Sequence, residues 1–300
     1  MKLTKTLTSL SAFALLASPA SAALFLYEGF DYATNGNVPA DEITGTQFNG
    51  GQGFSSGWTG STTNVPWSIG ETNGLEFSGL TTTGNRVLTR GTAPGAAEAH
   101  RSITGSVVTN MTASTLYFSF LFRPEWFSVG NENLSLMFGT SDILNSDGVT
   151  PVTSAGEAIG FGTDGLGSPD RFLFQAVGIE NGTSAGGSLG GQVLRGASNN
   201  ATIQMFYGKI EWAPNGSDDI LTLFQSDTDN SEGSFTQISS VSVDVDESLF
   251  TTLHVSGQQI SSIDEIRFGD SLASIGVIPE PSAALLGGLG TMLLLRRRRA

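Results

Sequence analysis

The sequence predicts an all-β protein built around a single antiparallel β-sandwich of about 250 residues. Short runs rich in β-branched and aromatic residues recur along the chain, and clusters of Gly, Asn, Asp and Ser separate them. No segment before residue 282 keeps a helical hydrophobic period over three turns. Residues 23–278 also contain no linker rich in Pro or Ser, so we expect one domain rather than two.

Eight segments carry the strand pattern most clearly. In the segment 115–123, hydrophobic side chains from Leu116 to Phe122 occupy every second position and should share one face. Ser119 and Arg123 fall on the other face. The expected strands, in chain order, are 24–28, 75–78, 115–123, 134–139, 171–177, 202–212, 220–225 and 260–269.

The composition supports a buried core and excludes several classes of function. The 300 residues are 39% hydrophobic and include 19 Phe. The chain contains no Cys, which excludes disulfide scaffolds, thiolate zinc sites, iron–sulfur clusters and thiol nucleophiles. Its 28 Asp and Glu outnumber 14 Lys and Arg, which gives a formal net charge of −14. Phosphate binding needs clustered basic residues, so we expect no nucleic-acid partner.

Residues 1–22 predict a secretory signal peptide. Lys2 and Lys5 precede a short apolar run, and the segment ends in Ala20-Ser21-Ala22. A basic start, an apolar middle and an A-x-A cleavage site are the three features of such a peptide. The apolar run is too short to span a bilayer, which disfavours a retained anchor. We therefore expect export across the inner membrane and cleavage after Ala22.

Residues 278–300 predict a second targeting segment. Pro279-Glu280-Pro281 precedes the uncharged stretch 282–295, and the arginines Arg296, Arg297, Arg298 and Arg299 follow it. A helix over that stretch would be about 21 Å long, short of a hydrocarbon core of about 30 Å. Residues 278–281 and extended arginines bring it to a marginal transmembrane span. The positive-inside rule would keep the arginines cytoplasmic and the body of the chain outside.

This arrangement of tripeptide, apolar helix and arginine cluster resembles the PEP-CTERM sorting signal of exopolysaccharide-producing Gram-negative bacteria. The resemblance implies that an exosortase is a partner of the chain. That enzyme would recognise Pro279, Glu280 and Pro281 and remove the tail during transit to the cell surface or extracellular matrix. Before that step, the C-terminal helix would hold the protein in the membrane.

The two ends of the remaining body resemble those of concanavalin A-like jelly-roll domains. The resemblance rests on residues 26–32, Leu-Tyr-Glu-Gly-Phe-Asp-Tyr, and residues 263–269, Ile-Asp-Glu-Ile-Arg-Phe-Gly. It implies that the first and last strands share one sheet, in a fold that hosts lectins and glucanases. The expected organisation is a signal peptide over 1–22, a β-sandwich over 23–277 and a sorting signal over 278–300.

No complete set of catalytic residues is present. Glucanases of this fold carry carboxylates at alternate positions of one strand, so that they project into one cleft. Asp244 and Asp246 share a face, but the next position on it is a serine and Glu247 points the other way. Asp264 and Glu265 are adjacent and should face opposite sides. A solvated strand face explains both clusters, and we assign no catalytic residue.

Three glycine motifs that suggest enzymes have simpler explanations. The G-x-G-x-x-G match at 160–165 is followed by Leu-Gly-Ser-Pro rather than by a helix, so we expect a turn. The G-x-S-x-G matches at 53–57 and 186–190 are expected by chance in a chain with 39 Gly. His100 and His254 are the only histidines available as bases, and we expect no serine triad.

Structural calcium is the one cofactor that the sequence suggests. Residues 227–233 begin like an EF-hand loop, but Gly stands at position 7 instead of 6 and Ile238 replaces the final Glu. Two further acids could join across a hairpin, which gives the candidate ligands Asp218, Asp219, Asp227 and Asp229. The alternative is that these acids keep hairpin tips soluble.

Trp126 is the candidate carbohydrate contact, because it directly follows the end of a strand and therefore lies in a loop. The other tryptophans are expected in the core. Together these observations predict an exported, non-catalytic surface or matrix protein that acts by adhesion or carbohydrate contact, with polysaccharide as a candidate partner. The alternatives are a surface glycoside hydrolase or lyase with carboxylates from separate strands, and a purely structural matrix protein.

Overall fold

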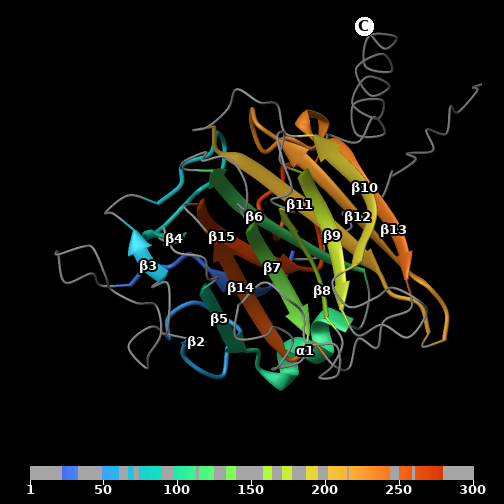
Figure 1. The fold of residues 1–300 in the computed structure, drawn as a ribbon, viewed down its shortest axis with the longest axis horizontal. Helices are drawn as coiled ribbons and strands as arrows, with labels where there is room; N and C mark the ends of the chain where they lie inside the picture. Colours follow the sequence, from blue (N-terminus) through green and yellow to red (C-terminus); the bar gives the residue numbers. More distant parts are fainter. Residues whose placement is uncertain are drawn as a thin grey trace, which may run out of the picture.

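The chain folds into two antiparallel sheets that lie face to face, with one short helix at the edge of the sandwich (Figure 1). The predicted all-β sandwich is therefore confirmed. The computed structural model describes the following residues, to which all structural statements refer: 22–32, 49–60, 67–70, 74–89, 97–112, 115–124, 133–139, 158–163, 171–177, 187–194, 202–214, 216–243, 250–258 and 261–279.

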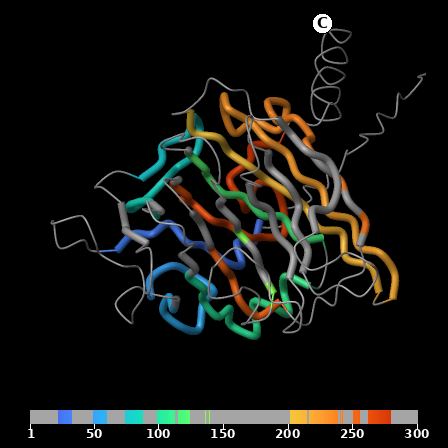
Figure 2. The backbone as a smooth tube through the Cα atoms, in the orientation of Figure 1, coloured from blue at the N-terminus to red at the C-terminus, as the bar shows by residue number. Residues whose placement is uncertain are grey.

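The eight-stranded sheet has the order β13-β12-β11-β6-β15-β4-β3, and β1 pairs with β15 beside this path. The first and last strands share this sheet, as the concanavalin A-like resemblance implied, and they lie side by side in blue and red in Figure 2. Its strands are β1 (Leu24–Glu28), β3 (Trp67–Gly70), β4 (Arg86–Thr89), β6 (Leu116–Pro124), β11 (Gln204–Glu211), β12 (Asp219–Ser226), β13 (Thr236–Val243) and β15 (Ser261–Gly269).

The seven-stranded sheet has the order β10-β9-β8-β7-β14-β5-β2. Helix α1 (Gly105–Thr112) follows β5 and packs Val107, Val108 and Met111 against the core, and the 3-10 turn η1 (Glu232–Ser234) precedes β13. The strands of this sheet are β2 (Thr59–Gly60), β5 (Ala97–Ser102), β7 (Asn133–Gly139), β8 (Ala158–Thr163), β9 (Arg171–Val177), β10 (Gly187–Leu194) and β14 (Thr252–Gln258).

Most strand predictions agree with the structure to within two residues, and those at 24–28 and 171–177 agree in full. The predicted strand at 75–78 is wrong, because this segment is coil and turn whose apolar side chains cover a sheet instead of joining one. The predicted turn at 160–165 is also wrong over its first four residues, which belong to β8. Small and polar residues in β5, β8, β10, β13 and β14 concealed those strands, because they lack the β-branched and aromatic pattern.

The main core lies between the sheets and centres on phenylalanines. Phe118, Phe120 and Phe122 of β6 point into it, as their alternation predicted. Phe120 stacks on Phe206 of β11, with ring centroids 5.2 Å apart. Gly208 fits the same region closely, since a Cβ at this position would lie 2.1 Å from the Phe118 ring. The sandwich is therefore packed through its centre.

A second cluster buries the outer face of the eight-stranded sheet. Residues 74–84 and 271–278, together called the covering layer, place Leu75, Phe77, Ile275 and Val277 against that face. Ser119 of β6 lies on the face opposite the phenylalanines, as expected, and is 1% exposed beneath this layer. The eight-stranded sheet is thus buried on both faces where this layer covers it, whereas Ile220 of β12 is 45% exposed and Lys209 of β11 is half-buried.

The predicted targeting segments lie almost entirely outside the described residues. Ala22 and Pro279 are described and exposed, whereas Ala20, Glu280, Pro281 and the arginines at 296–299 are not described. In the part of the chain that the structure describes, no helix is long and apolar enough to cross a membrane. The signal peptide and the sorting signal stay predictions.

Candidate functional site

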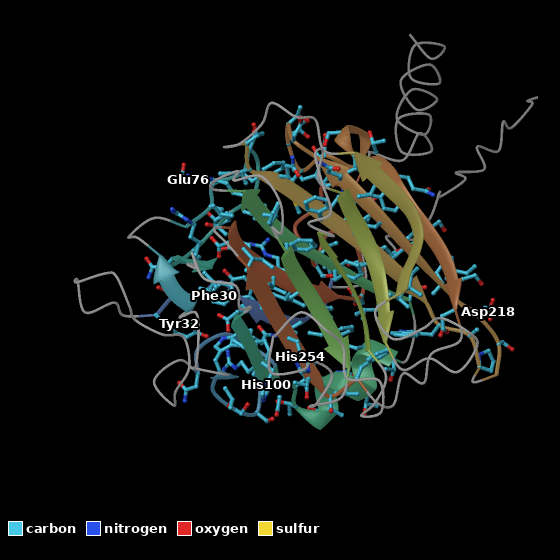
Figure 3. All side chains as sticks on the ribbon, viewed as in Figure 1. Phe30, Tyr32, Glu76, His100, Asp218 and His254 are labelled. Carbon is cyan, nitrogen blue, oxygen red and sulfur yellow. The ribbon has the colours of Figure 1, made fainter. Side chains whose placement is uncertain are left out.

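The two histidines meet on the outer face of the seven-stranded sheet. His100 of β5 and His254 of β14 are directly paired across the strands. Their ring centroids are 5.4 Å apart, and the ring planes are tilted by 36° (Figure 3). The flanking Ala99, Leu253 and Val255 point into the core, so strand alternation places both histidines on the opposite face. His254 is buried, and His100 is half-buried.

Strand register extends this pair into a row that crosses the whole sheet. In each pair along the row, one residue is the Cα partner of the next, so the positions share a face. The row contains polar positions at both ends and a glycine on β8, which has no side chain to raise the surface. In strand order from β2 to β10 it consists of Thr59, His100, His254, Met137, Gly160, Gln175 and Ser188.

A second polar group lies between the sheets and ties them together. The Arg101 guanidinium donates to the Glu28 carboxylate at 2.6 Å, and Tyr32 and Trp58 donate to the same carboxylate oxygen at 2.6 and 3.1 Å. Arg101 also lies over the Phe54 ring, 4.0 Å from its centroid. Burial raises the pKa of Glu28, and the Tyr32 hydrogen bond and the Arg101 charge act in the opposite direction. This group is closed to solvent and joins β1 to β5.

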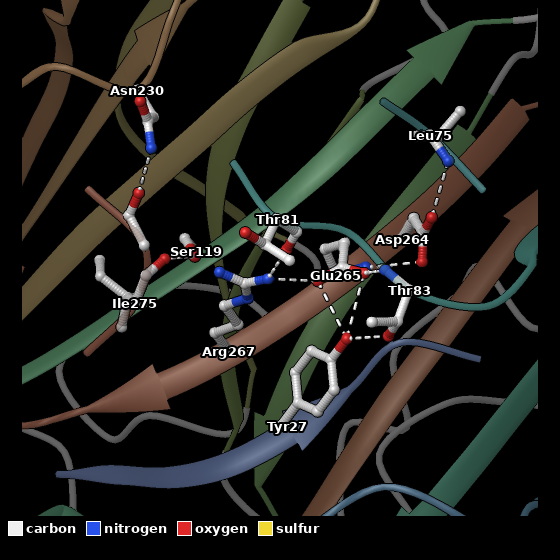
Figure 4. A network of polar contacts seen from close by, with 11 residues as sticks. Tyr27, Leu75, Thr81, Thr83, Ser119, Asn230, Asp264, Glu265, Arg267 and Ile275 are labelled. Atoms are coloured by element: carbon white, nitrogen blue, oxygen red, sulfur yellow. Dashed lines mark hydrogen bonds and ion pairs between the residues drawn. The ribbon is translucent and has the colours of Figure 1, made fainter. Parts of the chain in front are cut away.

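A third polar group lies under the covering layer and corrects a prediction about two acids. Asp264 and Glu265 were expected on opposite sides of β15, but a bulge between Asp264 and Arg267 interrupts its pairing with β6. Glu265 has a φ of 54°, in the left-handed region that such bulges require. Both carboxylates therefore face the covering layer (Figure 4). They are also fully buried, so the expected solvated strand face is wrong here.

The partners of these two acids are structural. Asp264 accepts hydrogen bonds from the backbone N–H of Leu75 and of Glu265, each at 2.8 Å. Glu265 accepts from the Thr83 backbone N–H at 2.6 Å, the Tyr27 hydroxyl at 3.1 Å and Arg267. Burial raises the pKa of Asp264 well above its usual range, and raises the pKa of Tyr27 to about 12. The acids anchor the covering layer and offer no open catalytic pair.

The four predicted calcium ligands do not come together. Asp218 and Asp219 stand at the start of β12, whereas Asp227 and Asp229 follow its end, roughly 25 Å away at the usual rise per residue. Asp219 is buried and accepts from the Ala213 backbone N–H at 2.7 Å. Ser231 donates to Asp229 through its backbone and hydroxyl, and these bonds lower the pKa of Asp229. The proposed joining across a hairpin is wrong, because β12 separates the two pairs.

No metal cluster of three or more His, Asp or Glu side chains occurs among the described residues. Trp126, Asp244, Asp246 and Glu247 lie outside them. Trp58 is in the core as expected. The half-buried Trp212 packs against Phe250 and donates to the Met111 carbonyl at 2.9 Å.

Sequence reasoning treated the histidines separately and missed their pairing. Each sits in a short strand that the sequence pattern did not identify, 154 positions from the other. The alternation Leu253-His254-Val255 is the one local signal that could have placed a histidine on an outer sheet face.

Comparisons with known proteins give similarity in shape only. No protein-family model matches the chain, and no curated protein matches it. A GH43 glycoside hydrolase with engineered endo-xylanase and exo-arabinofuranosidase activity has a TM-score of 0.44 and 10% identity, over 89% of this chain and 42% of that chain. Lectin I-B4 from Griffonia simplicifolia has a TM-score of 0.41 and 14% identity, over 70% and 91%.

A carbohydrate esterase of the Shiga toxin-encoding bacteriophage phi24B is similar at a TM-score of 0.41 and 12% identity, over 83% of this chain and 98% of that chain. The present chain spans less than half of the glycoside hydrolase. Scores and identities this low assign no function, which has to be argued from the residues themselves.

Proposed function

We propose that the chain is an exported surface or matrix protein that contacts carbohydrate through the outer face of its seven-stranded sheet. The observation that carries this proposal is the difference between the two outer sheet faces. Over much of its outer face the eight-stranded sheet is covered by apolar side chains of the covering layer, whereas the described outward side chains of the seven-stranded sheet are polar: Thr59 is exposed, His100 is half-buried, and Thr252 and His254 are buried. A sheet face with polar groups and few bulky side chains suits sugar hydroxyls.

The row of positions on this face supplies suitable chemistry. Imidazole, amide and hydroxyl groups both donate and accept hydrogen bonds, as neutral sugars require. Gly160 and Gly162 stand at alternate positions of β8, near the middle of the sheet, and allow a ligand to approach the backbone. A mature chain with many more acids than bases favours neutral sugars over polyanions.

The arrangement of the described acids supports a binding role over catalysis. Asp264 and Glu265 are adjacent, but their oxygens are occupied by backbone and side-chain donors beneath the covering layer. A glycosidase needs two carboxylates that reach the same bond from an open cleft. The hydrolase or lyase alternative would have to draw on acids other than this pair.

Contacts at the start of the body are compatible with the proposed export. The Ala23 backbone nitrogen lies 2.9 Å from an Asp270 carboxylate oxygen, and the Asp270 N–H bonds back to the Ala23 carbonyl. Cleavage after Ala22 would turn that nitrogen into an ammonium group and the hydrogen bond into an ion pair. The proposed sorting by an exosortase would act through residues 278–300.

A glycan array with the purified protein tests the proposed function. We expect retention on a restricted set of neutral glycans, and weaker retention after His100→Ala on the proposed face. Lys209→Ala is the matched control, since Lys209 lies in the eight-stranded sheet and pairs with Glu211 at 2.9 Å. Uniform absence of binding, or equal losses in both variants, would reject this face as a carbohydrate site.

A further inference from the structure

The chain contains two histidines and no cysteine, and the fold brings both histidines together. A side chain in a folded domain touches about 6–12 others, so two given residues among some 250 meet by chance roughly once in thirty cases. His100 and His254 come from strands separated by most of the domain, and neither strand is a hairpin partner of the other in sequence. This pairing concentrates all strong nitrogen ligands of the chain at one place.

The separation of the two rings is close to that of two imidazoles on one metal ion. Imidazole nitrogen binds zinc at about 2.0–2.1 Å, and a tetrahedral or right-angled pair then has ring centroids about 4.5–5.2 Å apart. The observed separation is 5.4 Å with a tilt of 36°, close to that range before any ion draws the rings together. Direct pairing across adjacent strands also fixes the two backbones, so little reorganisation is needed.

The two rings differ in exposure, so that the buried one would anchor a metal ion and the partly exposed one would let the ion enter from solvent. His254 is 1% exposed and is held between β5 and β7 in the sheet, whereas His100 is partly open to solvent. Further donor positions are close in register. Thr59 is paired with His100, and Met137 is paired with His254. The Thr59 hydroxyl or water would complete the ligand set.

We propose that His100 and His254 bind a borderline transition-metal ion, of the Zn²⁺ or Cu²⁺ class, on the outer face of the seven-stranded sheet. The ligands differ in kind from the acids considered for calcium, since imidazole suits zinc and copper and hard oxygen suits calcium. The site does not depend on the proposed carbohydrate contact. Its ion would stabilise the central pairing of β5 and β14 in the folded state.

Titration of the purified protein with ZnCl₂ and CuCl₂, followed by calorimetry, tests the site. We expect one ion per chain, loss of binding in both His100→Ala and His254→Ala, and a metal-dependent rise in Tm in the unchanged protein only. The matched control is Asp218→Asn, an exposed acid at the start of β12, which should bind as the unchanged protein does. CaCl₂ should produce no such rise through the histidines.

A spectroscopic measurement on the unchanged protein guards against variants that fail to fold. Because only two histidines exist, imidazole signals in an NMR spectrum belong to these residues alone. Zn²⁺ should shift both sets together, and Cu²⁺ should show hyperfine coupling to two imidazole nitrogens. Absence of binding, a shift in one ring alone, or binding retained in both histidine variants would overturn the proposal.

Discussion

The two sheets differ in what covers their outer faces. The eight-stranded sheet has a hydrophobic cluster on each side, one shared with the other sheet and one with the covering layer. Of the side chains that the structure describes in the seven-stranded sheet, Ala99, Leu136, Leu253 and Val255 join the shared core and none joins the second cluster. Among the described side chains, apolar residues therefore cover the outer face of the eight-stranded sheet, which we call the structural base, and polar residues occupy the outer face of the seven-stranded sheet, the proposed presenting face.

Hydrogen bonds from polar side chains to backbone carbonyls hold the covering layer in place. Ser119 donates to the Ile275 carbonyl and the Asn230 amide to the Gly276 carbonyl, each at 2.7 Å, while Arg267 donates to the Thr81 carbonyl at 2.6 Å (Figure 4). The layer ends at Ile278, the first residue of the proposed sorting signal. The covering layer of the structural base therefore ends where the proposed sorting signal begins.

The largest loss of stability is expected from Arg101→Leu, which removes the ion pair between Arg101 and Glu28 that joins the two sheets. Removing the guanidinium would leave the Glu28 carboxylate buried without its counter-charge. Breaking a buried pair in this way costs about 3–5 kcal/mol. Urea unfolding would measure the loss, and it should exceed that of any substitution on either outer face.

The matched control for this change is the double variant Glu28→Gln with Arg101→Leu. Removing the second charge relieves the uncompensated burial, so part of the lost stability should return. The opposite result would be a double variant that is less stable than Arg101→Leu by the full amount that Glu28→Gln costs on its own. The two residues would then not act as a pair across the sheets.

A smaller and pH-dependent effect is expected from Asp264→Asn, which tests how the covering layer is anchored. Asparagine keeps one acceptor and loses the other, at a cost of about 2 kcal/mol at low pH. Because the folded pKa of Asp264 is raised, the unchanged protein loses stability as pH rises from the ordinary value of 3.8 through the raised folded value. The variant has no such loss.

The deficit of Asp264→Asn should therefore shrink as pH rises through that window. Unfolding curves at several pH values, with both proteins in the same buffers, would show this convergence. A deficit that stayed constant or grew with pH would mean that Asp264 gains no proton affinity on folding.

Sequence patterns could predict the strands whose side chains alternate in size. Residues 116–122 predict strand β6 because large apolar residues recur at every second position. The same reasoning failed for residues 75–78, since a short apolar run looks identical whether it pairs as a strand or covers a sheet. It also missed β8, where alternate glycines resemble a turn but occupy one face of an interior strand of the sheet.

The candidate site was less predictable, because its residues come together only through long-range pairing. Nothing near His100 in the sequence points to His254, and their contact follows from the order of β14 and β5 in the sheet. The prediction that Asp264 and Glu265 face opposite sides of their strand failed for a local reason. Strand alternation assumes a regular ladder, and the bulge at Glu265 adds one residue that shifts it onto the face of its neighbour.

The smallest changes in the free energy of unfolding are expected from single substitutions that compare the two outer faces. Ser119→Ala leaves the buried Ile275 carbonyl without its donor and should cost about 1 kcal/mol. Thr59→Ala, on the outer face of the seven-stranded sheet, removes an exposed hydroxyl and should stay within about 0.5 kcal/mol. Urea unfolding of both variants measures the difference, and faster amide exchange over residues 271–278 in Ser119→Ala alone would locate it. Equal losses would contradict the division of the sandwich into a structural base and a presenting face, because a covered hydroxyl and an open one would then contribute alike.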